Sequence, residues 1–208
     1  GKEYRQDFRR GKPRTELKVV GPARGTGTKI SFTPDEQIFG PSQFDAELIR
    51  ERLEVKSYLN PGLKIVFRDE AAGRSVEMKH DGGISDYLGH IVKQRSARGI
   101  TPEIFRFQTE IPETGARIDA AIAWTDAPRE SFSSFVNTIP THDGGTHEQG
   151  LRDAVVRGMR SFIETHSLAP RGVTLSAEDL REGVIAILSV FMPDPQFQGQ
   201  TKDKLNNP

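Results

Sequence analysis

The sequence predicts an α+β fold in two parts, residues 1–80 and residues 81–208. Some segments repeat apolar residues at helical spacing, whereas others alternate or carry continuous β-branched runs, as strands do. The predicted helices cover residues 42–58, 85–94 and 146–165, and the main predicted strands cover residues 104–109, 116–125, 131–137 and 183–192. Gly82 and Gly83 stand just before the second helix, and we therefore place the boundary between the two parts there.

The composition is that of a globular protein and narrows the classes of function. Lys and Arg total 29, as do Asp and Glu, so the charge gives no overall nucleic-acid footprint and any DNA contact must come from a local patch. There is no cysteine, which excludes disulfides and thiolate metal sites. No apolar run approaches about 18 residues, and no signal-peptide core follows the basic N-terminus. We therefore expect a cytoplasmic protein without a membrane partner.

The first part is predicted to open with short strands and to continue with a helix and a hairpin. Residues 8–13 form a strand leading into a turn, and residues 16–20 and 28–32 form two more strands. Ser42 is the expected N-cap of helix 42–58, which ends at Asn60-Pro61-Gly62. The hairpin strands are residues 63–68 and 75–79, joined by a turn at residues 71–73.

In the second part, the three strands between residues 104 and 137 are compatible with an antiparallel meander, with Trp124 packed in the core. Thr146 and Gln149 have the spacing of a capping box at the start of helix 146–165. Pro170-Arg171-Gly172 is expected to turn, and Ser176 to cap a short helix. The apolar run 183–192 suits a central strand.

Two segments invite a ligand-site interpretation that their spacing does not support. Gly25-Thr26-Gly27-Thr28-Lys29 lacks the Gly-Lys-Ser/Thr order of a Walker loop, and a strand rather than a helix is expected next, so a structural turn is favoured. His142 and His147 are five residues apart, which does not place both on one helix face. A turn before a capped helix is favoured over a metal site, and we predict no metal ligand.

The segment after strand 183–192 carries Gln200 and Lys202 on a loop at the edge of the sheet. Pro193 and Pro195 end the strand, and Gly199 loosens the chain that follows. A loop lysine with a neighbouring amide donor suits a terminal phosphate, because lysine is a compact charge on a flexible stem. On these residues alone, however, a solvated polar tail is the favoured interpretation.

Four motifs, in their order along the chain, resemble the ATPase subunit of the bacterial type IIA DNA topoisomerases, that of gyrase or of topoisomerase IV. They are Gly25-Thr26-Gly27-Thr28, Ser57-Tyr58-Leu59-Asn60-Pro61-Gly62, the segment from Asn137 to His147, and Gln200-Thr201-Lys202. The resemblance implies the C-terminal half of a GHKL ATPase domain over residues 1–80, followed by a transducer domain of the ribosomal S5 type over residues 81–208.

The resemblance also implies an activity and its residues. Thr28 would border the adenine of ATP and Ile30 would line the same pocket. Lys202 would be the catalytic group that contacts the γ-phosphate, with Gln200 as a second donor. ATP and Mg²⁺ would be the cofactors of the intact subunit, with the magnesium ligand outside this sequence. The subunit would couple ATP hydrolysis to passage of one DNA duplex through another, with DNA, the breakage-reunion subunit and a second ATPase subunit as partners.

Several alternatives remain open at this stage. The sequence looks like an internal fragment that is inactive alone, and a non-catalytic S5-like module that binds nucleic acid or protein is the alternative function. Residues 170–179 favour topoisomerase IV, whereas Arg181-Glu182-Gly183 favours gyrase. The basic residues of the long helix and its surroundings favour a solvated face over a DNA-contacting one; they are Arg152, Arg157, Arg160 and Arg171.

Overall fold

The computed structural model describes residues 1–169 and 172–207, and the chain divides into two compact units, Gly1–Asp45 and Ala46–Pro208. Pro170 and Arg171, and with them most of the predicted turn at residues 170–172, lie outside the described residues.

The first unit is a small, open arrangement of short strands and one helical turn. Strand β1 (Lys2–Arg5) pairs antiparallel with β4 (Lys18–Pro22). Between them in the sequence, β2 (Phe8–Arg9) and β3 (Lys12–Pro13) form a short hairpin. The carboxylate of Asp35 accepts a hydrogen bond from the backbone N–H of Gln37 and so caps helix α1 (Glu36–Phe39). Every residue from 1 to 45 is described and none is buried, so this unit has no apolar core of its own.

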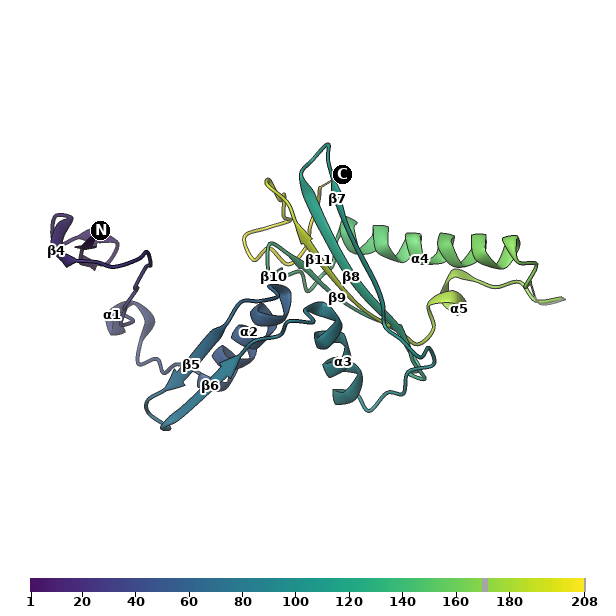
Figure 1. The fold of residues 1–208 in the computed structure, drawn as a ribbon, viewed down its shortest axis with the longest axis horizontal. Coiled ribbons are helices and arrows are strands. Elements are labelled where there is room, and N and C mark those ends of the chain that lie inside the picture. The colour runs from purple at the N-terminus through teal and green to yellow at the C-terminus, as the bar shows by residue number, and fades with distance from the viewer. Residues whose placement is uncertain (170–171, 208) are drawn as a thin grey trace. The chain divides into compact units, whose positions relative to one another are not determined.

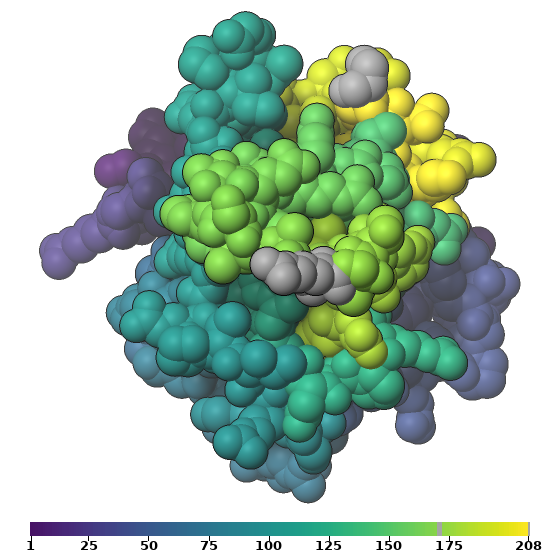
Figure 2. Space-filling model, turned by 90° about the vertical axis from the view of Figure 1, so that its right-hand side faces the viewer, coloured from purple at the N-terminus to yellow at the C-terminus, as the bar shows by residue number. Residues whose placement is uncertain are grey.

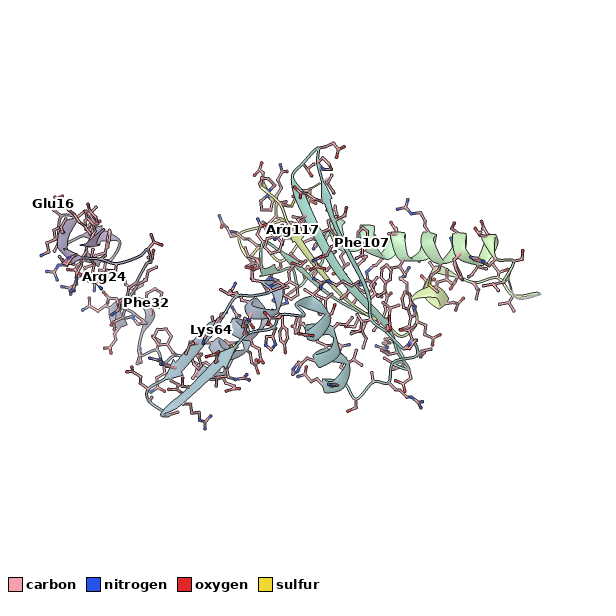
Figure 3. All side chains as sticks on the ribbon, viewed as in Figure 1. Glu16, Arg24, Phe32, Lys64, Phe107 and Arg117 are labelled. Atoms are coloured by element: carbon pink, nitrogen blue, oxygen red, sulfur yellow. The ribbon has the colours of Figure 1, made fainter. Side chains whose placement is uncertain are left out.

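Two predictions for this region are wrong. Residues 28–32 do not form a strand, and Ile30 and Phe32 are 81% and 72% exposed; Phe32 is labelled in Figure 3. A strand needs a partner for its backbone hydrogen bonds, and none of the strands described in residues 1–45 pairs with this segment. Ser42 is not an N-cap, because helix α2 (Ala46–Leu59) begins only at Ala46.

In the second unit, α2 leads into the predicted hairpin, formed by β5 (Ile65–Asp69) and β6 (Arg74–Met78), which is confirmed. The end of α2 packs on the start of helix α3 (Ile84–Gln94). The ring of Tyr58 stacks at 3.5 Å on that of His80 and at 5.0 Å on that of Tyr87. Gly83 is required here, since it has φ +63° and an added Cβ would lie 2.8 Å from Pro61. The motif at residues 57–62 is therefore a packing joint between α2 and α3.

A five-stranded mixed sheet is the centre of the second unit, and its order is β10-β9-β11-β8-β7. Its strands are β7 (Phe105–Ile111), β8 (Ala116–Trp124), β9 (Ser131–Val136), β10 (Ile139–Pro140) and β11 (Val184–Phe191). The predicted meander is wrong, because β11 lies between β8 and β9, antiparallel to the first and parallel to the second. The prediction that residues 183–192 form a central strand is confirmed.

The two faces of β11 bury different helices, as Figure 1 shows. Ile185 and Ile187 face a cluster that contains Leu88 of α3, and all three are at most 1% exposed. Residues such as Ala186 and Leu188 point to the opposite face, where partly buried Leu151 and Val155 of helix α4 (Thr146–Thr165) pack. Burying one such aliphatic side chain contributes about 1.5–3 kcal/mol, so both helices are fixed to the sheet by apolar contact.

The two helix caps predicted for the second part of the chain have different outcomes. Ser176 and Asp179 form a reciprocal capping box at the start of α5 (Ala177–Arg181), as predicted for Ser176. The capping box of Thr146 and Gln149 is wrong, because Gly145 is the N-cap of α4 and no side chain caps it. Trp124 is partly buried beside the α4-side cluster and donates through Nε1 to the Leu180 carbonyl at 3.4 Å, as a core residue would.

The contacts that join α2 to α3 place residues 46–80 in the same compact unit as the mixed sheet. The functional boundary near residue 80 stays a prediction.

Within the described residues, no helix is both long enough and apolar enough to cross a bilayer.

Candidate nucleotide-contact loop

The loop predicted to contact phosphate is closed by its own short ladder. We call residues 198–204, which contain Gln200-Thr201-Lys202, the QTK loop. Phe197 and Leu205 form an antiparallel bridge at its base. The N–H of Gln198 donates to the Lys204 carbonyl at 2.9 Å, and that of Asn206 donates to the Gln196 carbonyl at 2.8 Å. These bonds hold both ends of the loop at one place on the molecule.

Lys202 is presented to solvent at the tip of this loop. Both Gln200 and Lys202 are exposed, and Lys202 has a left-handed backbone, with φ +63°. Its Nζ lies 5.9 Å from the centre of the Phe197 ring, and among the described residues it makes no hydrogen bond or ion pair. The ammonium group is therefore accessible to an anionic ligand, and an aromatic ring stands beside it.

The base of the QTK loop is joined to the start of α4 by backbone hydrogen bonds. The N–H of Leu205, which is 2% exposed, donates to the Gly144 carbonyl at 3.1 Å, and the Leu205 carbonyl accepts from the N–H of Thr146 at 3.2 Å. The N–H of Asp143 donates to the Asp203 carbonyl at 2.9 Å. In Figure 2 the green atoms of α4 point toward the viewer, and yellow atoms of the C-terminal segment lie at the upper right. The segment from Asp143 to Thr146 thus supports the loop.

A second support lies at the other end of the segment that carries the QTK loop, where this segment leaves β11. Asn137 and Thr138 form the tight turn between β9 and β10, with φ +49° and +65°. The Asn137 side chain donates through Nδ2 to the Met192 carbonyl and accepts through Oδ1 from the Met192 N–H, each at 2.9 Å. The guanidinium of Arg117, labelled in Figure 3, lies 4.5 Å from the centre of the Phe191 ring at the same strand end.

The support by Asn137 was missed by sequence reasoning. A possible signal was the Asn-Thr pair between two apolar stretches, because asparagine is favoured in turns that need positive φ.

A buried polar group lies under the start of α4. The Ser134 hydroxyl donates to the Glu148 carboxylate at 2.8 Å, and the Thr141 hydroxyl donates to the Ser134 carbonyl at 3.0 Å. Thr141 Oγ1 lies 3.1 Å from Nε2 of His147, and Nδ1 of His147 is buried without a partner. Burial lowers the pKa of His147, and the negative charge of Glu148 opposes this shift only in part. These contacts give His147 a structural role.

The basic residues of α4 have different surroundings. The guanidinium of Arg152 is paired with Glu148 and Glu130 and lies over the Phe132 ring, so it is held within the fold. Arg157 and Arg160 are exposed. Arg171 lies outside the described residues.

The predicted adenine residues belong to the first unit, and the predicted phosphate residues to the second. Thr28 and Ile30 are both exposed on a segment without regular structure.

Among the described residues, no three His, Asp or Glu side chains converge as a metal site would require, and His142 and His147 therefore belong to no such group.

Comparisons with known proteins identify relatives of this chain. The model of the family described as DNA gyrase B matches residues 83–208. The gyrase B subunit of Campylobacter jejuni is 39% identical over all of this chain, which covers 26% of that subunit. The Thermotoga maritima subunit is 37% identical, again over the whole chain, which covers 33% of it. The chain thus spans about a third or less of the curated relatives it matches.

Solved structures resemble the fold closely. The 43K ATPase domain of Thermus thermophilus gyrase B, in complex with an aminocoumarin, matches with a TM-score of 0.84 and 33% identity, over 100% of this chain and 56% of that one. The topoisomerase IV ATP-binding domain of Francisella tularensis matches with a TM-score of 0.79 and 26% identity over the same shares. These matches confirm the α+β fold class, that of the GHKL ATPase region of type IIA topoisomerases. The chain belongs to the DNA gyrase B family.

Proposed function

We propose that this chain contributes the γ-phosphate sensor of a type IIA topoisomerase ATPase subunit. The observation that carries the proposal is the accessible ammonium group of Lys202, on a loop whose two ends are tied down. An exposed lysine on a disordered tail would spend most of its binding energy on becoming ordered, whereas a lysine on a closed loop is already placed.

In this proposal Lys202 acts by charge. Its ammonium group contacts the γ-phosphate of ATP and stabilises the negative charge that develops as the phosphoryl group is transferred, while the Gln200 amide donates a second hydrogen bond. Thr28 and Ile30 contact the adenine. Because ADP has no γ-phosphate, only the triphosphate engages Lys202, so the loop distinguishes the two nucleotides.

A magnesium ion would balance the charge of the triphosphate in the intact subunit. We assign no ligand for it, since the described residues bring together no set of metal-binding side chains.

The proposal extends to the whole subunit. Engagement of the QTK loop by ATP would couple the nucleotide state to passage of one DNA duplex through another. The partners would be DNA, the breakage-reunion subunit and a second copy of the ATPase subunit. The exposed Arg157 and Arg160 offer contacts to DNA phosphates, which would be sequence-independent and sensitive to salt.

The test is substitution of Lys202 in the full-length subunit, assayed with its partner subunit and DNA. Lys202→Ala is expected to lower the rate of ATP hydrolysis by about 10²-fold or more, as removal of a donor to transition-state charge does. The affinity for ADP should stay within about twofold of the original.

Lys204→Ala is the matched control. It removes the same charge from the same loop, and the Lys204 carbonyl that closes the loop remains. We expect it to leave turnover within about twofold of the original. Unchanged hydrolysis by Lys202→Ala, or equal loss in the two variants, would contradict the proposed role of Lys202.

A further inference from the structure

We propose that Asn137 is a positioning residue for Lys202: by holding Met192, it sets the direction in which the chain leaves β11 and enters the QTK loop. This inference rests on the proposed contact of Lys202 with the γ-phosphate. Asn137 itself touches no substrate and acts through the loop.

The β9–β11 ladder ends directly beside Asn137. The last pair of this ladder joins Val190 and Val136, and the backbone N–H of Asn137 still donates to the Val190 carbonyl at 2.8 Å. After that the chain of β9 turns away into β10. The Asn137 side chain then takes over, because its amide both donates to and accepts from the backbone of Met192. A primary amide can do this since it presents a carbonyl and an N–H side by side, as a peptide does.

The orientation of the Met192 backbone determines the path of the chain that follows it. Met192 is the last residue before Pro193, whose ring removes a backbone donor and fixes φ, so the path of the following segment depends on how Met192 is oriented. Residues 193–204 are otherwise held by the bonds at the base of the QTK loop, by the Asn207 side chain, which bonds to the backbone of Asp194 and Gln196, and by the contacts of Leu205 with Gly144 and Thr146. Without the Asn137 amide the loop is still closed, but it loses its side-chain tie to the end of β11 and can shift as a unit, and Lys202 shifts with it.

The effect on function follows from the demands of phosphoryl transfer. Charge stabilisation depends on the position of the donor, and a misplacement of about 1 Å can cost about 10²-fold in rate. Loss of the Asn137 amide is therefore expected to act on the γ-phosphate contact, and not on the binding of adenine or of ADP.

The turn offers an unusually clean substitution. Asn137→Gly deletes the amide yet keeps the left-handed backbone without strain, because glycine adopts positive φ freely. Thr138→Gly makes the same kind of change at the next position of the same turn, where the backbone is also left-handed. The Thr138 hydroxyl has only a 3.4 Å contact, with the ammonium group of Lys56, and none with Met192.

The experiment is a double-mutant cycle between Asn137 and Lys202 in the full-length subunit, with hydrolysis, ADP affinity and melting temperature measured for each variant. We expect Asn137→Gly to lower turnover by about 10-fold to 100-fold, with ADP affinity within about twofold. Thr138→Gly should stay within about twofold of the original in both. In the Lys202→Ala background, Asn137→Gly should have no further effect, because there is no ammonium group left to misplace.

The outcomes separate this inference from the proposed function. If Asn137→Gly slows hydrolysis by the same factor with and without Lys202, or no more than Thr138→Gly does, the positioning role is overturned while that of Lys202 stands. If Lys202→Ala itself has no effect, the proposed function fails. Asn137→Asp keeps the size of the side chain but cannot donate to the Met192 carbonyl, so it tests the same bond if the glycine variant does not fold. It should also slow turnover, and wild-type turnover would contradict the inference.

Discussion

A Cβ atom added to Gly145 would lie 2.3 Å from the carbonyl oxygen of Leu205. The two backbones approach too closely for any side chain, and Gly145 also has φ +140°, which other residues rarely adopt. The close approach allows the parallel bridge between Gly145 and Leu205, through which the start of α4 holds the base of the QTK loop. Gly145 therefore joins the start of α4 to a segment about 60 residues later in the sequence.

Gly145→Ala tests this joint. We expect it to destabilise the protein by about 1–3 kcal/mol or to displace residues 203–206 from α4, because the added methyl group and the positive φ are both unfavourable. Thermal unfolding measures the first effect, and amide hydrogen exchange of Leu205 the second. Gly150→Ala is the control: it lies within α4 with no atom within 4 Å of an added Cβ, so it should stabilise by up to about 1 kcal/mol. Equal effects of the two substitutions would exclude a special role for Gly145.

A second prediction concerns the buried carboxylate of Asp119 on β8. It accepts a hydrogen bond from the Gln108 side chain at 2.8 Å and pairs with the Arg106 guanidinium at 3.1 Å. Asp119→Ala should lower the free energy of unfolding by about 1–3 kcal/mol, because both donors lose their acceptor in a partly buried place. Urea denaturation gives the value. Asp153→Ala, which removes an exposed carboxylate of α4, should change it by less than about 0.5 kcal/mol, and a similar loss there would count against the argument.

A third prediction follows from His147. Its folded-state pKa is lowered by burial, whereas in the unfolded chain it is about 6.5. As the pH falls through 6.5, the unfolded state takes up a proton before the folded state does. The stability that the neutral ring contributes is therefore complete above about pH 6.5 and is lost as the pH falls toward the lowered pKa.

Unfolding free energies measured between pH 7.5 and 5 check this prediction. His147→Gln, which cannot take up a proton, should reduce the loss of stability on acidification. His142→Gln, at an exposed position in the same segment, should keep the loss seen in the original protein. A steeper loss in His147→Gln than in the original protein would contradict the assignment.

Sequence reasoning succeeded where local pattern determines structure. The apolar face of residues 146–165 predicted α4 with its observed bounds, and the β-branched run at 183–192 predicted a buried strand. It failed where structure depends on residues far away. Nothing in residues 104–137 shows that Ile187 and its neighbours come between β8 and β9, so consecutive strands were expected to pair.

The same contrast applies to the candidate site. Lys202 was found through the family motif that contains it, since the residues alone favoured a solvated tail. The supports of its loop could not be found that way. The Asn137 amide reaches Met192, and Leu205 reaches Gly145, and both contacts join segments that are adjacent only after folding. Thr146 has the spacing of a cap, but its N–H is taken by Leu205 instead.

The central place of β11 also bears on how the protein folds. Because β11 follows β8 and β9 with α4 and α5 between, the sheet cannot close until β11, which ends at Phe191, is available to pair with both. Until then β8 and β9 each have an unpaired edge, and such edges favour aggregation. Contacts between such distant segments form slowly. We therefore expect slow refolding, and we expect the QTK loop, which follows β11 in the sequence, to take its position only after the sheet has closed.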